Sequence, residues 1–170
     1  LRAAALLHDL EGDVDSRDGH QLAAADKAEE ILARDGWEQE SIEAVKHCIR
    51  AHRFRDQREK PGTIEARVLF DADKLDAIGA VGIARAFGYA VRAGQDLYQL
   101  PSKKFLENSE REPGEAHTPY HEYLYKLKRI QSRLFTKTAR KISQDRQRIM
   151  ELFFEQWVKE VEMGKKGSND

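Results

Sequence analysis

Apolar and small residues recur three or four positions apart along most of this chain, and the alternating pattern typical of β-strands is nearly absent. One segment carries this stripe at Ala24, Ala28, Ile31 and Leu32, and the next carries it at Ile42, Val45 and Ile49. Such stripes are buried when helices pack against one another. The sequence therefore predicts an all-α protein, a compact bundle of six or seven helices.

Turn-forming residues predict where these helices begin and end. Asp35-Gly36 should end the first helix, and Glu40 or Ser41 should begin the next. Close helix crossings or kinks are indicated by three glycines within a helical stretch, Gly79, Gly82 and Gly88.

The last helix should be long and should close the fold over residues 120–163. Its apolar residues are spaced for an inward stripe at Ile142, Ile149, Phe153 and Trp157. The polar residues 164–170 that follow predict a disordered tail. We therefore expect a single domain over residues 1–163.

Composition excludes several classes of protein. A chain of 170 residues suits one domain, and 29 Lys and Arg against 30 Asp and Glu argue against a general electrostatic nucleic-acid binder. The single cysteine, Cys48, cannot form an intrachain disulfide, which fits a reducing cytoplasm. No apolar run approaches the length of a membrane span, so we expect no membrane partner. The sequence leaves a homo-oligomer open.

The dipeptide His8-Asp9 is the first candidate for a functional site. It ends an almost wholly apolar run over residues 1–7, and Gly12 follows as a natural helix terminator. Both side chains should therefore lie in a last helical turn, where the negative end of the helix dipole favours a cation. An imidazole beside a carboxylate at such a place predicts a metal site.

Asp73 supplies the second half of this site. Thr63 is a plausible N-cap for a helix over residues 64–77, which should place Leu69, Asp73, Asp76 and Ala80 on one inward face. Buried carboxylates are costly without a counter-charge, so acids on this face require a cation, an arginine or a water-filled pocket. For Asp71 and Asp76, a solvated or salt-bridged state is an equally open alternative.

These residues resemble the HD-domain superfamily of metal-dependent phosphohydrolases. His8-Asp9 matches the family's His-Asp doublet and Asp73 its distant aspartate, which implies that His8, Asp9 and Asp73 are metal ligands. Residues 47–54 and 71–85 look more narrowly like the bacterial predicted HD hydrolases typified by YedJ and YpgQ. The resemblance covers nearly the whole chain and implies a compact HD-domain helical bundle.

The family's first histidine lies on a helix before the doublet, whereas here only seven residues precede His8. Leu1 is not an initiator methionine and lies within an apolar helix. We therefore expect the given chain to lack an N-terminal helix that carries this ligand. His20 is an alternative, as a replacement ligand.

Two further histidines, His47 and His52, lie on different sides of their predicted helix. His52 falls in the sector of Ile42, Val45 and Ile49, whereas His47 falls on nearly the opposite side. His52 is therefore a candidate catalytic group for phosphate contact or proton transfer, with a satisfied core histidine as the alternative. His20 begins its helix, where backbone N–H groups favour anions, so it is a candidate substrate contact.

The remaining candidates carry charge. Glu11 and Asp13 follow the doublet closely enough to take a proton from a metal-bound water, and related HD hydrolases often have an acid there. Arg53, Lys74 and Arg85 are candidates for binding substrate phosphate, because positive charge stabilises phosphoryl transfer. A solvated surface role is the alternative for each of these residues.

The preferred function is a metal-dependent phosphohydrolase acting on nucleotides or related phosphate esters. The resemblance points to nucleoside phosphates; cleavage of deoxynucleoside triphosphates to monophosphate and pyrophosphate is one expectation, and phosphomonoesters are left open. Mixed nitrogen and oxygen ligands suit Mn²⁺, Fe²⁺, Ni²⁺ or Co²⁺ better than Mg²⁺. One alternative is a nucleotide-binding or regulatory HD module with weak catalysis. Another is a nucleic-acid or protein-binding domain that uses the basic residues within 126–148, although a solvated amphipathic helix explains those residues better.

Overall fold

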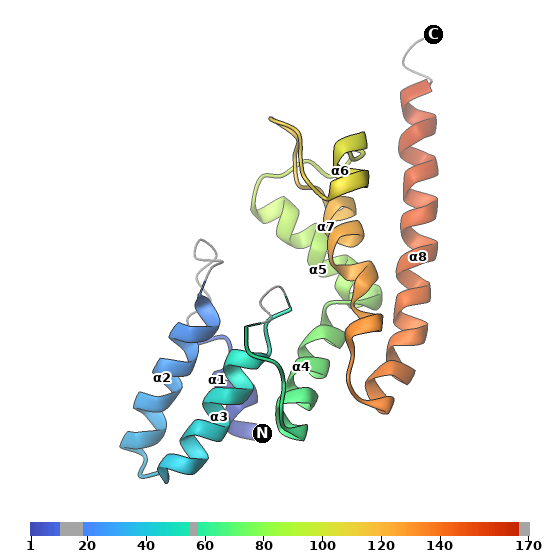
Figure 1. The fold of residues 1–170 in the computed structure, drawn as a ribbon. Helices are drawn as coiled ribbons and strands as arrows, with labels where there is room; N and C mark the ends of the chain where they lie inside the picture. Colours follow the sequence, from blue (N-terminus) through green and yellow to red (C-terminus); the bar gives the residue numbers. More distant parts are fainter. Residues whose placement is uncertain (11–18, 55–57, 167–170) are drawn as a thin grey trace. The chain divides into compact units, whose positions relative to one another are not determined.

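The structure, a computed structural model, describes residues 1–10, 19–54 and 58–166. Within these residues the chain forms eight α-helices and two short 3-10 helices, and no strand (Figure 1). The all-α prediction is therefore confirmed, but the expected number of helices was too low. The chain divides into two compact units, which we describe separately: Leu1–Lys74 with Leu134–Thr136, and Leu75–Arg133 with Lys137–Asp170.

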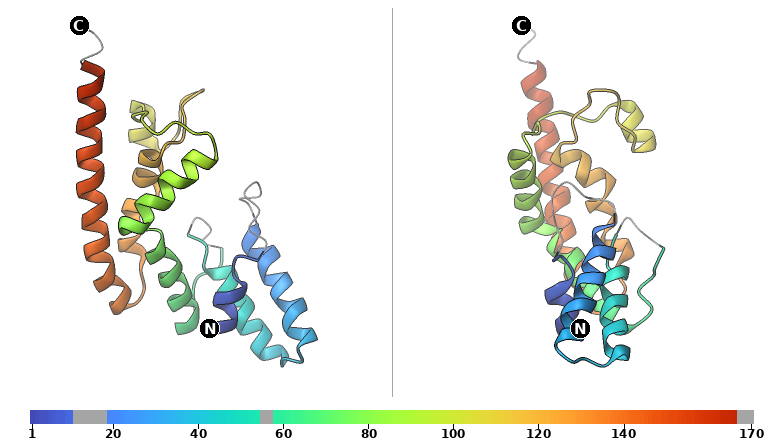
Figure 2. Two further views of the ribbon diagram at one scale, coloured as in Figure 1. Left: turned by 180° about the vertical axis from the view of Figure 1, so that it is seen from behind. Right: turned by 90° about the vertical axis from the view of Figure 1, so that its left-hand side faces the viewer.

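The first unit contains four helices: α1 (Arg2–Leu7), α2 (His20–Arg34), α3 (Gln39–Ala51) and α4 (Ile64–Asp76), whose last residues belong to the second unit. α2 and α3 lie side by side as a hairpin (Figures 1 and 2). Gly36, with φ +77, stands at the turn after α2, so the predicted helix end is confirmed. The predicted N-cap of α4 also forms, since the Thr63 hydroxyl accepts from the N–H of Ala66 at 3.2 Å.

The predicted stripes of α2 and α3 form the core of the first unit. Alanines on α2 let α3 approach closely, and the leucines and isoleucines fill the space between the helices. The buried residues are Ala4, Ala24, Ala25, Ala28, Leu32, Ile42, Val45, Cys48, Ile49, Ala51, Ala66 and Leu69. One expectation for α4 was wrong: Asp76 and Ala80 are exposed, and the buried charged residues in this region are Asp71 and Lys74.

The second unit contains α5 (Gly79–Arg92), α6 (Lys103–Asn108), α7 (Pro119–Tyr125), η1 (Leu127–Arg129), η2 (Gln131–Arg133) and α8 (Lys137–Lys166). α5 packs against α7 and α8. Gly79 begins α5 at φ +79, and a Cβ there would lie 2.9 Å from Cγ of Arg146. Glycine thus allows both the left-handed backbone and the close approach of α8.

The predicted long C-terminal helix is confirmed as α8, but its predicted extent over residues 120–163 and its predicted inward stripe were wrong. α7 and the two 3-10 helices interrupt it, and α8 begins only at Lys137. The predicted inward stripe was also displaced, because Ile142, Ile149 and Phe153 are exposed and only Trp157 is buried. The residues of α8 that are actually buried are Ala139, Ser143, Gln147, Met150, Phe154 and Trp157.

At its end, α8 continues through residues 164–166, which the sequence placed in a disordered tail, and residues 167–170 lie outside the described part.

Aromatic rings fill the core of the second unit around α8. Phe154 stacks on Tyr123 with ring centroids 4.3 Å apart, and Trp157 lies 5.4 Å from Tyr120. None of the helices in the described residues is long and apolar enough to span a bilayer.

Candidate metal centre

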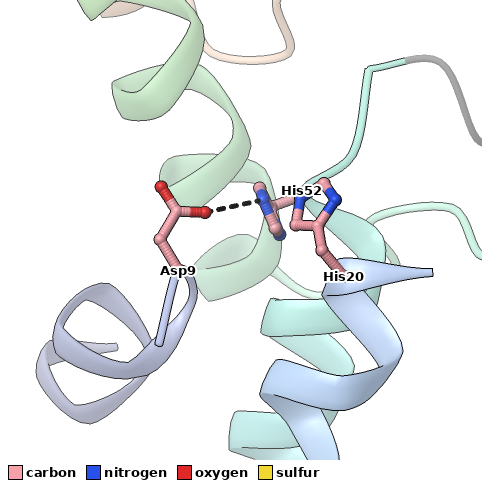
Figure 3. Close-up of side chains that lie close together, drawn as sticks. All are labelled: Asp9, His20 and His52. Atoms are coloured by element: carbon pink, nitrogen blue, oxygen red, sulfur yellow. Dashed lines mark ion pairs between the residues drawn. The ribbon is translucent and has the colours of Figure 1, made fainter. Parts of the chain in front are cut away.

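Three side chains of the first unit meet between the end of α1, the start of α2 and the end of α3. Asp9, His20 and His52 each place one potential ligand atom within 4.8 Å of the others (Figure 3). Nε2 of His52 lies 3.9 Å from the Asp9 carboxylate, and the His20 and His52 ring centroids are 6.0 Å apart. Residues 43 positions apart in sequence are thus brought within reach of one ion.

The tautomers of His8 and His52 follow from their backbone contacts. Nδ1 of His8 lies 2.9 Å from the carbonyl oxygen of Ala5, and Nδ1 of His52 lies 2.5 Å from that of Ile49. A carbonyl only accepts, so Nδ1 carries a proton in both rings, and Nε2 is the ring nitrogen left for other contacts. Nε2 of His8 lies 3.4 Å from Asp9 and Nε2 of His52 lies 3.9 Å from it, so both ring nitrogens face the same carboxylate.

His52 is buried from solvent. It follows the last residue of α3 and continues the buried stripe of Val45 and Ile49, and only 3% of its surface is exposed. Burial lowers the pKa of His52 below its ordinary value, and the nearby Lys74 charge acts in the same direction. The ring is therefore neutral at neutral pH, which is the form that binds a metal.

Asp73 and Lys74 form an ion pair on α4 beside this cluster. Burial works to raise the pKa of Asp73, but the charge of the Lys74 ammonium and its hydrogen bond hold it below the ordinary value. The Lys74 ammonium is itself buried, 5.4 Å from the centroid of the Phe70 ring. An ionised carboxylate is thus maintained at the edge of the histidine cluster.

Two arginines near His52 have different surroundings. Arg53 donates to the side-chain oxygen of Gln21 at 2.9 Å, and Gln21 is almost fully buried at the start of α2. Arg50 donates to Glu59, whose carboxylate also lies 2.6 Å from Nδ1 of His47. His47 and Arg50 therefore fix the segment before α4, whereas Arg53 lies at the cluster.

The other predicted residues are placed as follows. Arg85 belongs to the second unit and pairs with Asp76 there. Glu11 and Asp13 lie outside the described residues. Sequence reasoning did not single out Gln21, although its spacing from Ala24, Ala25 and Ala28 places it on the buried stripe of α2.

Comparison with known proteins identifies the family. The sequence model of the HD domain matches residues 1–78, which include His8, Asp9, His20, His52 and Asp73. YpgQ of Bacillus subtilis is 34% identical over 164 residues, covering 95% of this chain and 72% of that protein. The chain belongs to the HD-domain superfamily.

Solved structures agree with this assignment of the HD-domain chain. The crystal structure of Bacillus subtilis YpgQ in complex with ADP matches with a TM-score of 0.65 and 34% identity, over 93% of this chain and 74% of that one. A crystal structure of an HD-superfamily hydrolase from Bacillus thuringiensis matches with a TM-score of 0.62 and 30% identity, over 93% and 71%. The HD-domain fold and the relation to hydrolases are thus shown.

HD domains bind divalent metals, and the donor chemistry of this HD-domain chain fits such an ion. The Nε2 atoms of His8 and His52 lie next to Asp9, and a second ionised carboxylate stands at Asp73. Mixed nitrogen and oxygen donors of this kind suit transition metals.

Proposed function

We propose that this HD-domain chain is a metal-dependent phosphohydrolase acting on nucleotides or related phosphate esters. The observation that carries the proposal is the meeting of Nε2 of His8 and Nε2 of His52 at the Asp9 carboxylate. A ligand atom of His20 also lies within 4.8 Å of those of Asp9 and His52. Such a donor set has no evident structural purpose, because its carboxylate is largely exposed and its rings are already anchored through Nδ1.

His8, Asp9 and Asp73 would hold the cation, and His20 and His52 would complete or extend the donor set. A bound divalent cation supplies positive charge for phosphate oxygens and a water of lowered pKa. The nitrogen donors favour a transition metal such as Mn²⁺, Fe²⁺, Ni²⁺ or Co²⁺ over Mg²⁺.

Protein groups around this centre would bind and orient the phosphate. Arg53 is held beside the cluster by Gln21, so its guanidinium can keep that bond through one nitrogen and offer others to an anion. Lys74 keeps its ammonium at the carboxylate of Asp73, where positive charge can reach a phosphate oxygen. Because Nε2 of His52 cannot bind the cation and carry a proton at once, proton transfer by His52 requires that the cation be held by the other donors; Glu11 and Asp13 are further acid and base candidates from the sequence.

The nucleotide class is supported by one comparison. YpgQ, 34% identical over most of this chain, has been crystallised with ADP. This supports nucleoside phosphates as substrates. We propose cleavage of triphosphates to monophosphate and pyrophosphate as the reaction from the sequence resemblance alone. Simple phosphomonoesters are the comparison class for the assay.

A substrate panel tests the proposal. The purified chain would be assayed with Mn²⁺ against nucleoside mono-, di- and triphosphates and p-nitrophenyl phosphate, with orthophosphate and pyrophosphate measured separately. We expect turnover of nucleotides that is lost with a chelator and restored by Mn²⁺. Asp73→Asn should abolish turnover, whereas Asp76→Asn should retain it, since Asp76 is exposed and pairs with Arg85.

Two results would contradict the proposal. Saturable nucleotide binding without turnover under any of the four metals would indicate a regulatory module. Equal activity in the Asp73→Asn and Asp76→Asn variants would show that hydrolysis takes place elsewhere.

A further inference from the structure

Lys74 carries a positive charge into the interior of the first unit. Its side chain is only 8% exposed, although a lysine usually extends its ammonium into water. Taking an ammonium out of water is costly unless other groups compensate its charge. The structure must therefore contain contacts that hold this ammonium inward.

Two neighbours on α4 compensate the Lys74 ammonium. It forms an ion pair with Asp73, and its Nζ atom lies 5.4 Å from the centroid of the Phe70 ring. Among the described residues, Asp73 is the only acid that pairs with it. The ring attracts the positive charge without accepting a directed hydrogen bond, and an ammonium has three N–H donors. Donors of Lys74 are thus left for a phosphate oxygen.

The Phe70 ring is itself held by Phe135, a residue from the C-terminal half of the chain. The two ring centroids lie 5.2 Å apart and the ring planes meet at 83°, which is the edge-to-face arrangement that aromatic pairs favour. Phe70 is buried, so its ring has little room to turn. Phe135 therefore helps to fix the ring on which the Lys74 ammonium lies.

The backbone of Phe135 is anchored independently of its ring. Its N–H donates to the Asp71 carboxylate at 2.9 Å, and the N–H of Thr136 donates to the same carboxylate at 2.7 Å. The Phe135 residue, by contrast, is 40% exposed, so its ring is not part of a closed core. The ring can therefore be removed while the backbone segment keeps its anchor.

The position of this ammonium matters for phosphate chemistry. A lysine places a point charge at the end of a flexible side chain, so its location depends on the groups around it. A displacement of about 1 Å can lower the rate of an enzyme reaction by about 100-fold. A ring that fixes Lys74 would therefore affect turnover without touching the substrate.

We propose that Phe135 is a positioning residue for Lys74. Through the Phe70 ring it keeps the ammonium at Asp73, where the phosphate of a substrate would bind. The use of Lys74 in turnover rests on the proposed hydrolase function, whereas the contacts from Phe135 to Lys74 do not. The candidate site thus depends on the segment Leu134–Thr136, although all of its candidate metal ligands lie in the first 74 residues.

Chemical labelling of lysines tests this positioning without an assay of activity. The folded chain would be treated with an amine-acetylating reagent, and mass spectrometry of its peptides would give the rate at each lysine. Phe135→Ala should raise the rate at Lys74 roughly 10-fold, because the ring that holds the ammonium is loosened. Phe135→Tyr keeps the ring and should keep the wild-type rate. Lys46, which is 12% exposed and pairs with Glu29, is the internal control and should not change.

Two labelling results would contradict the proposal. An unchanged rate at Lys74 in Phe135→Ala would mean that Phe70 holds the ammonium without help from Phe135. An equal rise at Lys74 and Lys46 would mean that the substitution has loosened the whole unit rather than released one side chain.

A double-mutant cycle tests the consequence for turnover. Phe135→Ala should lower kcat/KM for nucleotides roughly 10-fold through the displaced ammonium. Trp37→Ala, which removes a ring of similar exposure from the same unit, should leave kcat/KM unchanged. In a Lys74→Met background, Phe135→Ala should have no further effect, because both residues act through the same ammonium.

The cycle separates this proposal from the proposed function. An equal loss of kcat/KM from Phe135→Ala with and without Lys74 would show that Phe135 does not act through Lys74. Absence of turnover in the wild-type chain would contradict the hydrolase function instead, and the labelling rates of Lys74 and Lys46 would still decide the role of Phe135.

Discussion

The carboxylate of Asp71 accepts a hydrogen bond from the backbone N–H of Thr136 at 2.7 Å, across 65 residues of sequence. It also accepts from the N–H of Phe135 at 2.9 Å, and Asp71 is almost fully buried. This contact ties the segment Leu134–Thr136 to α4, the helix that carries Asp73.

Removal of this carboxylate should destabilise the protein. Asp71→Ala leaves the partly buried N–H groups of Phe135 and Thr136 without their acceptors, so we expect the free energy of unfolding to fall by roughly 3 kcal/mol. Urea unfolding measures the change. Asp76→Ala is the matched control on the same helix, where loss of an exposed ion pair should cost below about 1 kcal/mol. Similar losses in the two variants would mean that Asp71 does not anchor the segment.

Two glycines of α5 should respond oppositely to alanine. A Cβ at Gly82 would lie 2.2 Å from the carbonyl oxygen of Ala77, so Gly82→Ala forces the backbone to move and should cost about 2 kcal/mol or more. At Gly88 nothing lies within 4 Å, so Gly88→Ala should stabilise the helix by up to about 1 kcal/mol. Thermal unfolding of the two variants would show opposite shifts in Tm, and shifts of one sign would contradict the packing of α5.

Glu115 should make the second unit sensitive to acid. Burial works to raise its pKa, but hydrogen bonds from the N–H groups of Ser102 and Glu112 and from His121 lower it to about 2. A carboxyl pKa that is lower in the folded protein than in the unfolded protein stabilises the fold. This stabilisation is present above pH 4.5, the ordinary pKa of the group, and is lost as the pH falls toward 2.

The Glu115→Gln variant tests this pH dependence. Its deficit in unfolding free energy relative to wild type should be largest above pH 5 and should shrink as the pH falls through the window between about 4.5 and 2. Chemical unfolding at a series of pH values gives the comparison. A deficit that does not change with pH would mean that the negative charge of Glu115 does not contribute to the stability of the second unit.

The helices of the first unit could be predicted from sequence because their signals are local. Thr63 caps α4, Gly36 ends α2, and the stripe of Ile42, Val45 and Ile49 points inward, each for a reason contained within a few residues. The stripe of α8 could not be read in this way. Its buried face includes Ser143 and Gln147, so choosing the most apolar residues selected the wrong side of the helix.

The candidate site shows a similar limit. The pattern His8-Asp9 with Asp73 can be recognised in sequence, but the approach of His52 and His20 to Asp9 depends on how α1, α2 and α3 pack. The burial of Lys74 and the exposure of Asp76 likewise depend on which face of α4 is covered. Residue spacing alone does not determine either.

Arg53 should contribute to substrate binding more than to the chemical step. Arg53→Ala removes a guanidinium held at the cluster by Gln21, so we expect KM for nucleotides to rise about 10-fold, with a smaller change in kcat. Arg34→Ala at the exposed end of α2 is the control and should leave both constants unchanged. Unchanged KM and kcat in Arg53→Ala would mean that Arg53 does not contact the substrate and serves only to hydrogen-bond Gln21.

Metal affinity tests the central claim most directly. Calorimetric titration of the metal-free chain with Mn²⁺ should give saturable binding, and Asp9→Asn should weaken it by at least about 10-fold, because the change keeps the shape of the side chain and removes its charge. Asp9 is largely exposed, so the metal-free variant should unfold at the wild-type temperature, and Asp76→Asn should bind Mn²⁺ like the wild type. If Asp9→Asn binds Mn²⁺ as tightly as the wild-type chain, the cluster of Asp9, His20 and His52 is not the metal centre and the proposed mechanism is wrong.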